Sequence, residues 1–178
     1  MKLLLVLACR KMELFAAEWV EFDLATNKLW RIPASKTKSG EARELPLPTV
    51  VIDWLKELQA RACGSDYVFP ARRRSKRFKH VSPDTTWHAL RKLKHGLEHF
   101  TIHDLRRSAR SLMADLSIPF DVAEKILGHK LPGVAAIYDR GGSLKQQRAA
   151  LEKLAGLIAQ LDEGDKISNV VLMKGGGA

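Results

Sequence analysis

The sequence is poor in cysteine and has no long apolar run. Its two cysteines, Cys9 and Cys63, could form at most one disulfide bond, far fewer than small secreted domains use. No segment approaches the roughly 20 apolar residues that cross a bilayer. The apolar stretch 3–8 is also shorter than the roughly 7–15 residues of an export signal. We therefore expect a cytoplasmic protein without a membrane partner.

Acidic residues are in the minority. The 178 residues include 30 Lys and Arg against 20 Asp and Glu, which gives a formal net charge of +10. Such an excess is compatible with nucleic acid, an acidic membrane surface or no specific partner. The apolar content of 46% excludes a disordered chain and predicts one domain with a real core. Six of the positive charges gather in one short run, at Arg72, Arg73, Arg74, Lys76, Arg77 and Lys79.

Helical patterns predominate along the chain, with one β region near the N-terminus. Strand-like runs at 28–34 and 42–47 flank a small, polar segment that is typical of a hairpin tip, and 67–69 is a candidate third strand. Apolar residues at helical spacing predict helices over 3–20, 50–62, 83–97, 102–115, 120–127 and 143–161. The expected fold is therefore α+β and mainly α, with a small three-stranded antiparallel sheet.

Specific residues mark where several of these helices begin and end. Thr101 and Asp104 have the spacing of a capping box, in which each residue bonds the backbone N–H of the other. Gly128 is suited to end the helix over 120–127, because glycine adopts the left-handed conformation at little cost. Ser143 is a candidate N-cap of the last helix.

Some polar residues do not fit a pure packing account. Arg10 interrupts an apolar helical stretch and can meet Glu13 one turn later, although a surface ion pair would look the same. His103 and Arg106 share the first turn of a helix, where free N–H groups favour an anion such as phosphate. His129, after Gly128, could simply cap a helix. Taken alone, Tyr138 is typical of the edge of a core.

A metal site is the next possibility that the histidines raise. His95, His99 and His103 are spaced by four, which on one continuous helix would suggest metal ligands. Gly96 and the cap at Thr101 predict a break in that helix, so we attribute the spacing to chance. We expect no metal.

The order of these polar residues carries more information than any one of them. Arg-Lys-Met-Glu-Leu at 10–14, Lys-Thr at 36–37, His-Asp-Leu-Arg at 103–106, Leu-Gly-His at 127–129 and Tyr138 resemble the catalytic domain of the tyrosine recombinase (phage integrase) family. The resemblance extends from Leu3 to about Arg140. Residues 8–9, Ala-Cys, stand where members commonly have Thr-Gly. We interpret the chain as a member of this family.

The resemblance implies a role for each matching residue. Tyr138 would attack the scissile phosphate, Lys36 would protonate the leaving 5′ oxygen, and His103 would act as general base or phosphate ligand. The other matching residues would bind or support that phosphate: Arg10, Arg106, His129 and Glu13.

General chemistry requires the same residue types. A phenol with a pKa of about 10 is a poor nucleophile at neutral pH without a proton acceptor or a strongly positive surrounding. Guanidinium groups can each donate two hydrogen bonds to the phosphate oxygens, on which negative charge develops. Such chemistry needs no metal, and we expect no cofactor.

The resemblance also implies an organisation and partners. Residues 1–162 would form the catalytic domain, 163–178 a tail that is exchanged between subunits or folds back, and the N-terminal core-binding domain would be absent. The partners would be double-stranded DNA attachment sites, bound weakly by this one domain, and further copies of the chain in a tetramer on DNA. Two alternatives stay open: a catalytically silent DNA-binding protein of the same fold, and an enzyme similar to type IB topoisomerases.

Overall fold

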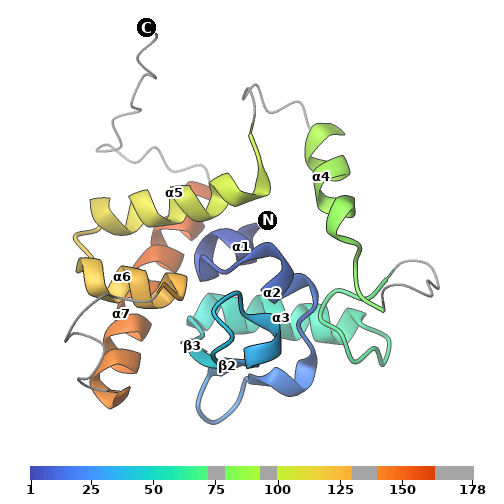
Figure 1. Ribbon diagram of the computed structural model, residues 1–178, viewed down its shortest axis with the longest axis horizontal. Helices are drawn as coiled ribbons and strands as arrows, with labels where there is room; N and C mark the ends of the chain where they lie inside the picture. Colours follow the sequence, from blue (N-terminus) through green and yellow to red (C-terminus); the bar gives the residue numbers. More distant parts are fainter. Residues whose placement is uncertain (72–78, 93–99, 130–139, 163–178) are drawn as a thin grey trace, which may run out of the picture.

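The computed structural model describes residues 1–71, 79–92, 100–129 and 140–162. Helices surround a three-stranded antiparallel sheet, as the sequence predicts (Figure 1). Two short 3₁₀ turns, η1 (Trp19–Glu21) and η2 (Ala34–Lys36), accompany the strands β1 (Phe22–Asp23), β2 (Leu29–Ile32) and β3 (Arg43–Pro46). The α-helices of the described residues are α1 (Lys2–Leu7), α2 (Lys11–Phe15), α3 (Thr49–Arg61), α4 (Pro83–Lys92), α5 (Ile102–Asp115), α6 (Phe120–Leu127) and α7 (Arg140–Asp162).

The N-terminal segment forms two short helices, so the prediction of one helical stretch over 3–20 is wrong. α1 ends at Ala8, whose φ of 47° and ψ of 24° are left-handed, and Arg10 is extended before α2 begins. α1 packs against both α5 and α7 and is buried on several sides, with Leu3, Val6 and Leu7 in the core. The turn at Ala8 therefore directly follows a helix that is buried in the core of the protein.

The sheet confirms the predicted hairpin but not the candidate third strand. β2 pairs with β1 on one side and β3 on the other, with Trp30 opposite Phe22 and Leu45. Residue Tyr67 makes an isolated bridge with Glu18 and lies outside the sheet. Trp30 is fully buried and stacks on Phe22 with ring centroids 5.1 Å apart. A central Trp thus anchors a sheet that is too small to form a core by itself.

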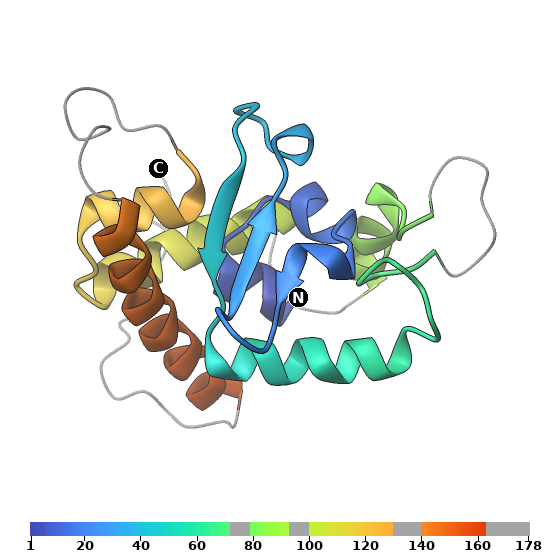
Figure 2. The same ribbon diagram turned by 90° about the horizontal axis from the view of Figure 1, so that it is seen from below.

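The C-terminal helices begin and end largely where their capping residues predict. Thr101 N–H donates to Asp104 Oδ2 over 2.8 Å, which forms the expected capping box of α5. Gly128 ends α6 with a φ of 67°. α7 begins before the predicted cap at Ser143, whose Oγ instead accepts a hydrogen bond from Gln147 within the helix. α7 contacts α1, α3, α6 and β3, and so joins the helices to the sheet (Figure 2).

None of the described helices combines the length and the apolar character that spanning a membrane requires.

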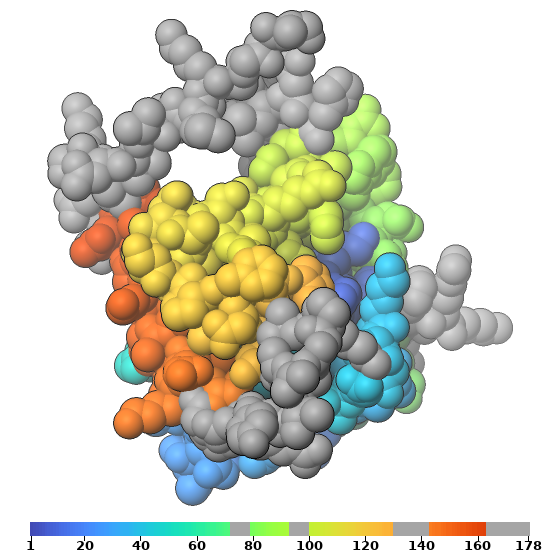
Figure 3. All heavy atoms as spheres, turned by 60° about the vertical axis from the view of Figure 1, so that its left-hand side comes forward, coloured from blue at the N-terminus to red at the C-terminus, as the bar shows by residue number. Residues whose placement is uncertain are grey.

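The helices α5 and α6 form one continuous surface, with the β2–β3 hairpin on the same face of the molecule (Figure 3). Arg106 of α5 contacts both His129, which follows α6, and Ala8 in the turn between α1 and α2.

Candidate active site

Glu13 fixes Arg10 at the start of α2. Its Oε2 accepts the backbone N–H of Arg10 over 2.9 Å, and its Oε1 accepts Nη1 of the same residue over 3.0 Å. The Glu13 side chain is 1% exposed and that of Arg10 is 27% exposed. A buried carboxylate therefore orients a guanidinium group that still reaches solvent.

Arg43 is a residue of this site that the sequence reasoning missed. Its Nη2 donates to Glu13 Oε2 over 2.9 Å, and its Nη1 donates to the Ile126 carbonyl over 2.7 Å. It thereby connects the start of α2 with the end of α6. The sequence did contain a signal: Arg43 lies two residues before Leu45, so both side chains fall on the same, buried face of the strand.

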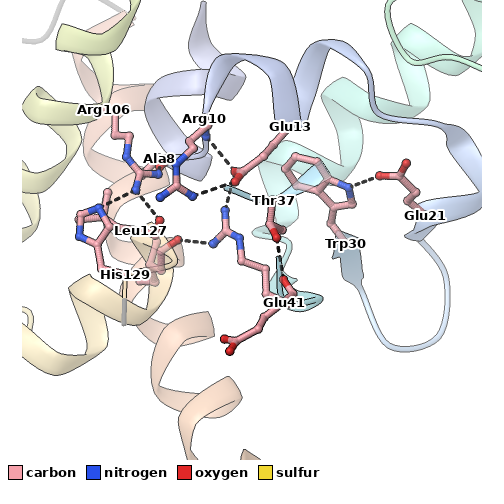
Figure 4. A network of polar contacts seen from close by, with 12 residues as sticks. Ala8, Arg10, Glu13, Glu21, Trp30, Thr37, Glu41, Arg106, Leu127 and His129 are labelled. Carbon is pink, nitrogen blue, oxygen red and sulfur yellow. Dashed lines mark hydrogen bonds and ion pairs between the residues drawn. The ribbon is translucent and has the colours of Figure 1, made fainter. Parts of the chain in front are cut away.

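Arg106 lies at the centre of the site. Only 5% of the residue is exposed, and its guanidinium group donates to the carbonyls of Ala8 and Leu127 and to Nε2 of His129, the last over 3.0 Å. These bonds use three of the five N–H groups of an arginine. Figure 4 shows the guanidinium groups of Arg10 and Arg106 next to one another. Their remaining N–H groups can bind an oxyanion.

The site carries an excess of positive charge. Burial and the nearby charges of Arg10 and Arg43 lower the pKa of Arg106 to about 10, which leaves it charged at neutral pH. Burial alone would raise the pKa of Glu13, but Arg43 and Arg10 outweigh burial and lower it. Three guanidinium groups therefore face one carboxylate, and the imbalance favours a bound anion.

The two predicted histidines have different surroundings. His129 contacts Arg106 through Nε2 and places Nδ1 2.5 Å from Glu124 Oε2. Glu124, which the sequence reasoning also missed, accepts Arg110 Nε on its other oxygen over 2.8 Å. His103 is exposed on the first turn of α5, ahead of Arg106.

Lys36 does not join the arginines. Its Nζ donates to the Ala16 carbonyl over 2.7 Å, to Glu18 over 2.9 Å and to Glu21. Burial would lower the pKa of Lys36, but the two carboxylates outweigh burial and raise it. In Figure 4 Glu21 lies on the far side of Trp30 from Arg10 and Arg106, and it is this carboxylate that the Lys36 ammonium group binds.

Several predicted residues lie outside the described part of the chain. These are the nucleophile candidate Tyr138 and five of the basic run, Arg72, Arg73, Arg74, Lys76 and Arg77. Lys79, the last of that run, is exposed. The histidines His95 and His99 also fall outside, and no group of three possible metal ligands occurs among the described residues.

Cys9 adjoins the arginine cluster but is unsuited to be a nucleophile. Burial, together with the charge of Glu13, raises the pKa of its thiol to about 12. The reactive form of cysteine is the thiolate, which such a thiol does not supply near neutral pH. Within the described ranges, the cluster is therefore suited to binding an anion and lacks a nucleophile of its own.

Comparison with known proteins gives a consistent result. The model of the phage integrase family matches residues 1–141. The tyrosine recombinase XerA of Pyrococcus furiosus is 31% identical over 131 residues, covering 72% of this chain and 44% of that protein. Prophage integrase IntF of Escherichia coli K12 is 28% identical over 179 residues, covering 98% of this chain and 36% of that protein. The chain thus spans less than half the length of these relatives.

A solved structure supports the fold. The integrase from mycobacterium phage Brujita superposes with a TM-score of 0.64 over 86% of this chain and 50% of that chain. The sequences are 16% identical, so this likeness concerns the fold alone.

Proposed function

The chain belongs to the phage integrase family, and on this basis we propose that it is a site-specific DNA recombinase domain that cuts and rejoins strands through a 3′-phosphotyrosine intermediate. The observation that carries the proposal is the convergence of Arg10, Arg106 and His129 from three separate segments. A cluster of this kind, with guanidinium N–H groups still available, fits a phosphodiester better than a structural ion pair.

In the proposed reaction, the Tyr138 oxygen attacks the scissile phosphorus and the bond from phosphorus to the 5′ oxygen breaks. The phenol proton passes to a base, for which His103 is the candidate, and the 5′ oxygen takes a proton from a lysine. A 5′ hydroxyl of another strand then attacks the phosphotyrosine and releases the phenol. The phosphoester bond is conserved throughout, so rejoining needs no ATP.

The arginines act on the phosphate itself in this proposal. Arg10 and Arg106 bind its non-bridging oxygens, and His129 donates a further hydrogen bond. Glu13 and Arg43 hold these groups in place through the contacts described above. The basic run ending at Lys79 contacts the DNA backbone outside the reaction centre. The chemistry uses no cofactor or metal.

We further propose that the domain acts in the cytoplasm on double-stranded attachment sites, as a tetramer on DNA. Recombination exchanges two duplexes, which requires cleavage of four strands and hence four tyrosines. Residues 163–178, the proposed exchanged tail, lie outside the described chain.

The test is covalent capture of DNA. A library of nicked duplexes with randomised sequence is incubated with the protein, because the nick lets the cleaved fragment diffuse away and traps the adduct. We expect a denaturation-resistant complex whose peptide link maps to Tyr138. The variant Tyr138→Phe should form none. Tyr67→Phe is the matched control, since it removes the other of the two tyrosines and should retain capture.

The alternatives predict different results. A silent DNA-binding protein would bind the library but form no adduct, and Tyr138→Phe would change nothing. An enzyme similar to type IB topoisomerases would form the adduct and relax arbitrary supercoiled plasmids without yielding recombinants.

A further inference from the structure

The partners of His129 determine where its proton lies. Arginine N–H groups can only donate, so Nε2 of His129 must accept the bond from Arg106. An ionised carboxylate can only accept, so Nδ1 must carry the hydrogen that faces Glu124. The ring is therefore neutral, with its proton on Nδ1.

Glu124 is ionised in this arrangement. Partial burial alone would raise its pKa, but the hydrogen bonds from His129 and Arg110 outweigh burial and lower it. Arg110 donates to Oε1 of Glu124 and stacks on Phe120 at 5.1 Å, so Oε2 is the oxygen that accepts from His129.

Glu124 and Arg106 contact the His129 ring directly, and two further arginines lie next to these partners or to Gly128. Glu124 belongs to α6. Two arginines belong to α5 and a third to β3, and the guanidinium group of the third lies against Gly128. These arginines are Arg106, Arg110 and Arg43. The ring is 45% exposed and can exchange protons with solvent.

We infer that Glu124 is a positioning residue for the proposed cleavage: it keeps the resting proton of His129 on Nδ1 and supports uptake of a second proton, from solvent, at Nε2 when a phosphate enters. This inference rests on the proposed function.

The physical reason is a conflict between acceptors. A phosphate oxygen beside Arg106 would face the Nε2 lone pair, and two acceptors repel one another. A proton at Nε2 converts the repulsion into a charge-assisted hydrogen bond. The resulting imidazolium sits between a carboxylate and a phosphate, so Glu124 compensates for the arginines that would otherwise oppose it.

Nuclear magnetic resonance of the histidine ring nitrogens tests the first part without DNA. Long-range ¹H–¹⁵N spectra of labelled protein distinguish the two neutral tautomers, and loss of signals in His129→Gln assigns the ring among six histidines. We expect a protonated Nδ1 in the wild type and in Glu124→Gln, whose amide oxygen can still accept. Glu124→Met should weaken this preference, because only the hydrogen bond from Arg106 then favours it. A wild-type ring with its proton on Nε2 would overturn the inference.

Titration with sulfate tests the second part, because sulfate is tetrahedral and does not itself titrate near neutrality. At saturation, followed by the amide signals of Arg106 and Gly128, the wild-type ring should move to the imidazolium position. In Glu124→Gln it should stay neutral. Glu44→Gln, which removes an exposed carboxylate from β3, is the control and should behave as wild type. A wild-type ring that stays neutral at saturation would contradict the inference.

Covalent capture then connects the ring to the reaction. Glu124→Gln should cleave nicked DNA at least about tenfold more slowly than the Glu44→Gln control. Equal rates would refute a positioning role. If neither the wild type nor any variant formed an adduct, the result would count against the proposed function. The tautomer measurement would still test the role of Glu124, because it needs no DNA.

Discussion

Lys36 and Lys38 lie two residues apart in one hairpin and have contrasting surroundings. The Lys36 ammonium is bound by two carboxylates and a carbonyl, which makes it a weaker acid. Lys38 is exposed and makes no hydrogen bond or ion pair with another described residue. A proton donor should be within reach of the substrate and not already bound by carboxylates. These contacts favour Lys38 over the sequence candidate Lys36.

The two lysines can be separated by changing the leaving group. A substrate with sulfur in place of the bridging 5′ oxygen releases a thiolate, which needs no proton. We expect Lys38→Met to slow cleavage of the oxygen substrate at least about 100-fold and to recover on the sulfur substrate. The matched variant Lys36→Met should chiefly lower the free energy of unfolding, because Glu21 is left buried without its ammonium partner. If only Lys36→Met regained its cleavage rate on the sulfur substrate, the proton donor would be Lys36.

Some residues of the site can be identified from the order of residues along the chain, and others only from contacts in the folded protein. Arg10, Glu13, Arg106 and His129 were predicted because their order along the chain resembles a known pattern. Arg43 and Glu124 act through contacts between β3, α5 and α6, which depend on how distant segments pack. Neither residue stands at a position that the pattern marks, and the strand register of Arg43 with Leu45 indicates burial but not its partners, so the fold is needed to identify both roles.

Two helices end at the arginine cluster, and both endings present a carbonyl to it. α1 ends in the left-handed Ala8, and α6 ends at the left-handed Gly128. Arg106 donates to the carbonyl of Ala8 and to that of Leu127, directly before Gly128. The last carbonyls of a helix lack partners within it and carry partial negative charge. Arg106 therefore caps two helices, which explains how a buried cation is held at the proposed phosphate site.

At the scale of the element, we predict that Gly128→Ala destabilises the protein. Its φ of 67° costs an alanine about 1–2 kcal/mol. A Cβ there would also lie 3.1 Å from the Arg43 guanidinium, which would have to move. Urea unfolding measures the change. Gly156→Ala is the control, because it lies in α7 with open space around it and should stabilise by up to about 1 kcal/mol. Equal stability of Gly128→Ala and wild type would contradict this account.

Helix termini were predictable to different degrees for a physical reason. α5 and α6 carry local signals, a capping box and a C-terminal glycine, which act within one turn. The break after α1 has no such signal, because Ala8 is held left-handed by its surroundings, including its bond to Arg106. The start of α7 before Ser143 likewise depends on more than the local residue.

The whole molecule brings together groups that the chain keeps far apart. Arg10 precedes α2, Arg43 begins β3, Arg106 lies in α5, and His129 follows α6. The sequence predicted the class of fold, and it proposed which residues would bind a phosphate. It could not predict which contacts close the site, because those depend on packing of α1 and α7 against the sheet and α5.

Charge distribution over the molecule leads to a prediction about DNA binding. Replacing the six basic residues 72–74, 76, 77 and 79 by glutamine lowers the formal net charge from +10 to +4. Each lost phosphate contact removes about 0.9 from the slope of log K against log salt, so the slope should flatten by up to about 5. Fluorescence anisotropy with duplex DNA at several salt concentrations measures it. The control replaces six exposed basic residues of β2, its preceding turn, α3 and α7, which lowers the net charge equally: Lys28, Arg31, Lys56, Arg61, Lys145 and Lys153. If both variants flatten the slope alike, net charge rather than the basic run drives binding.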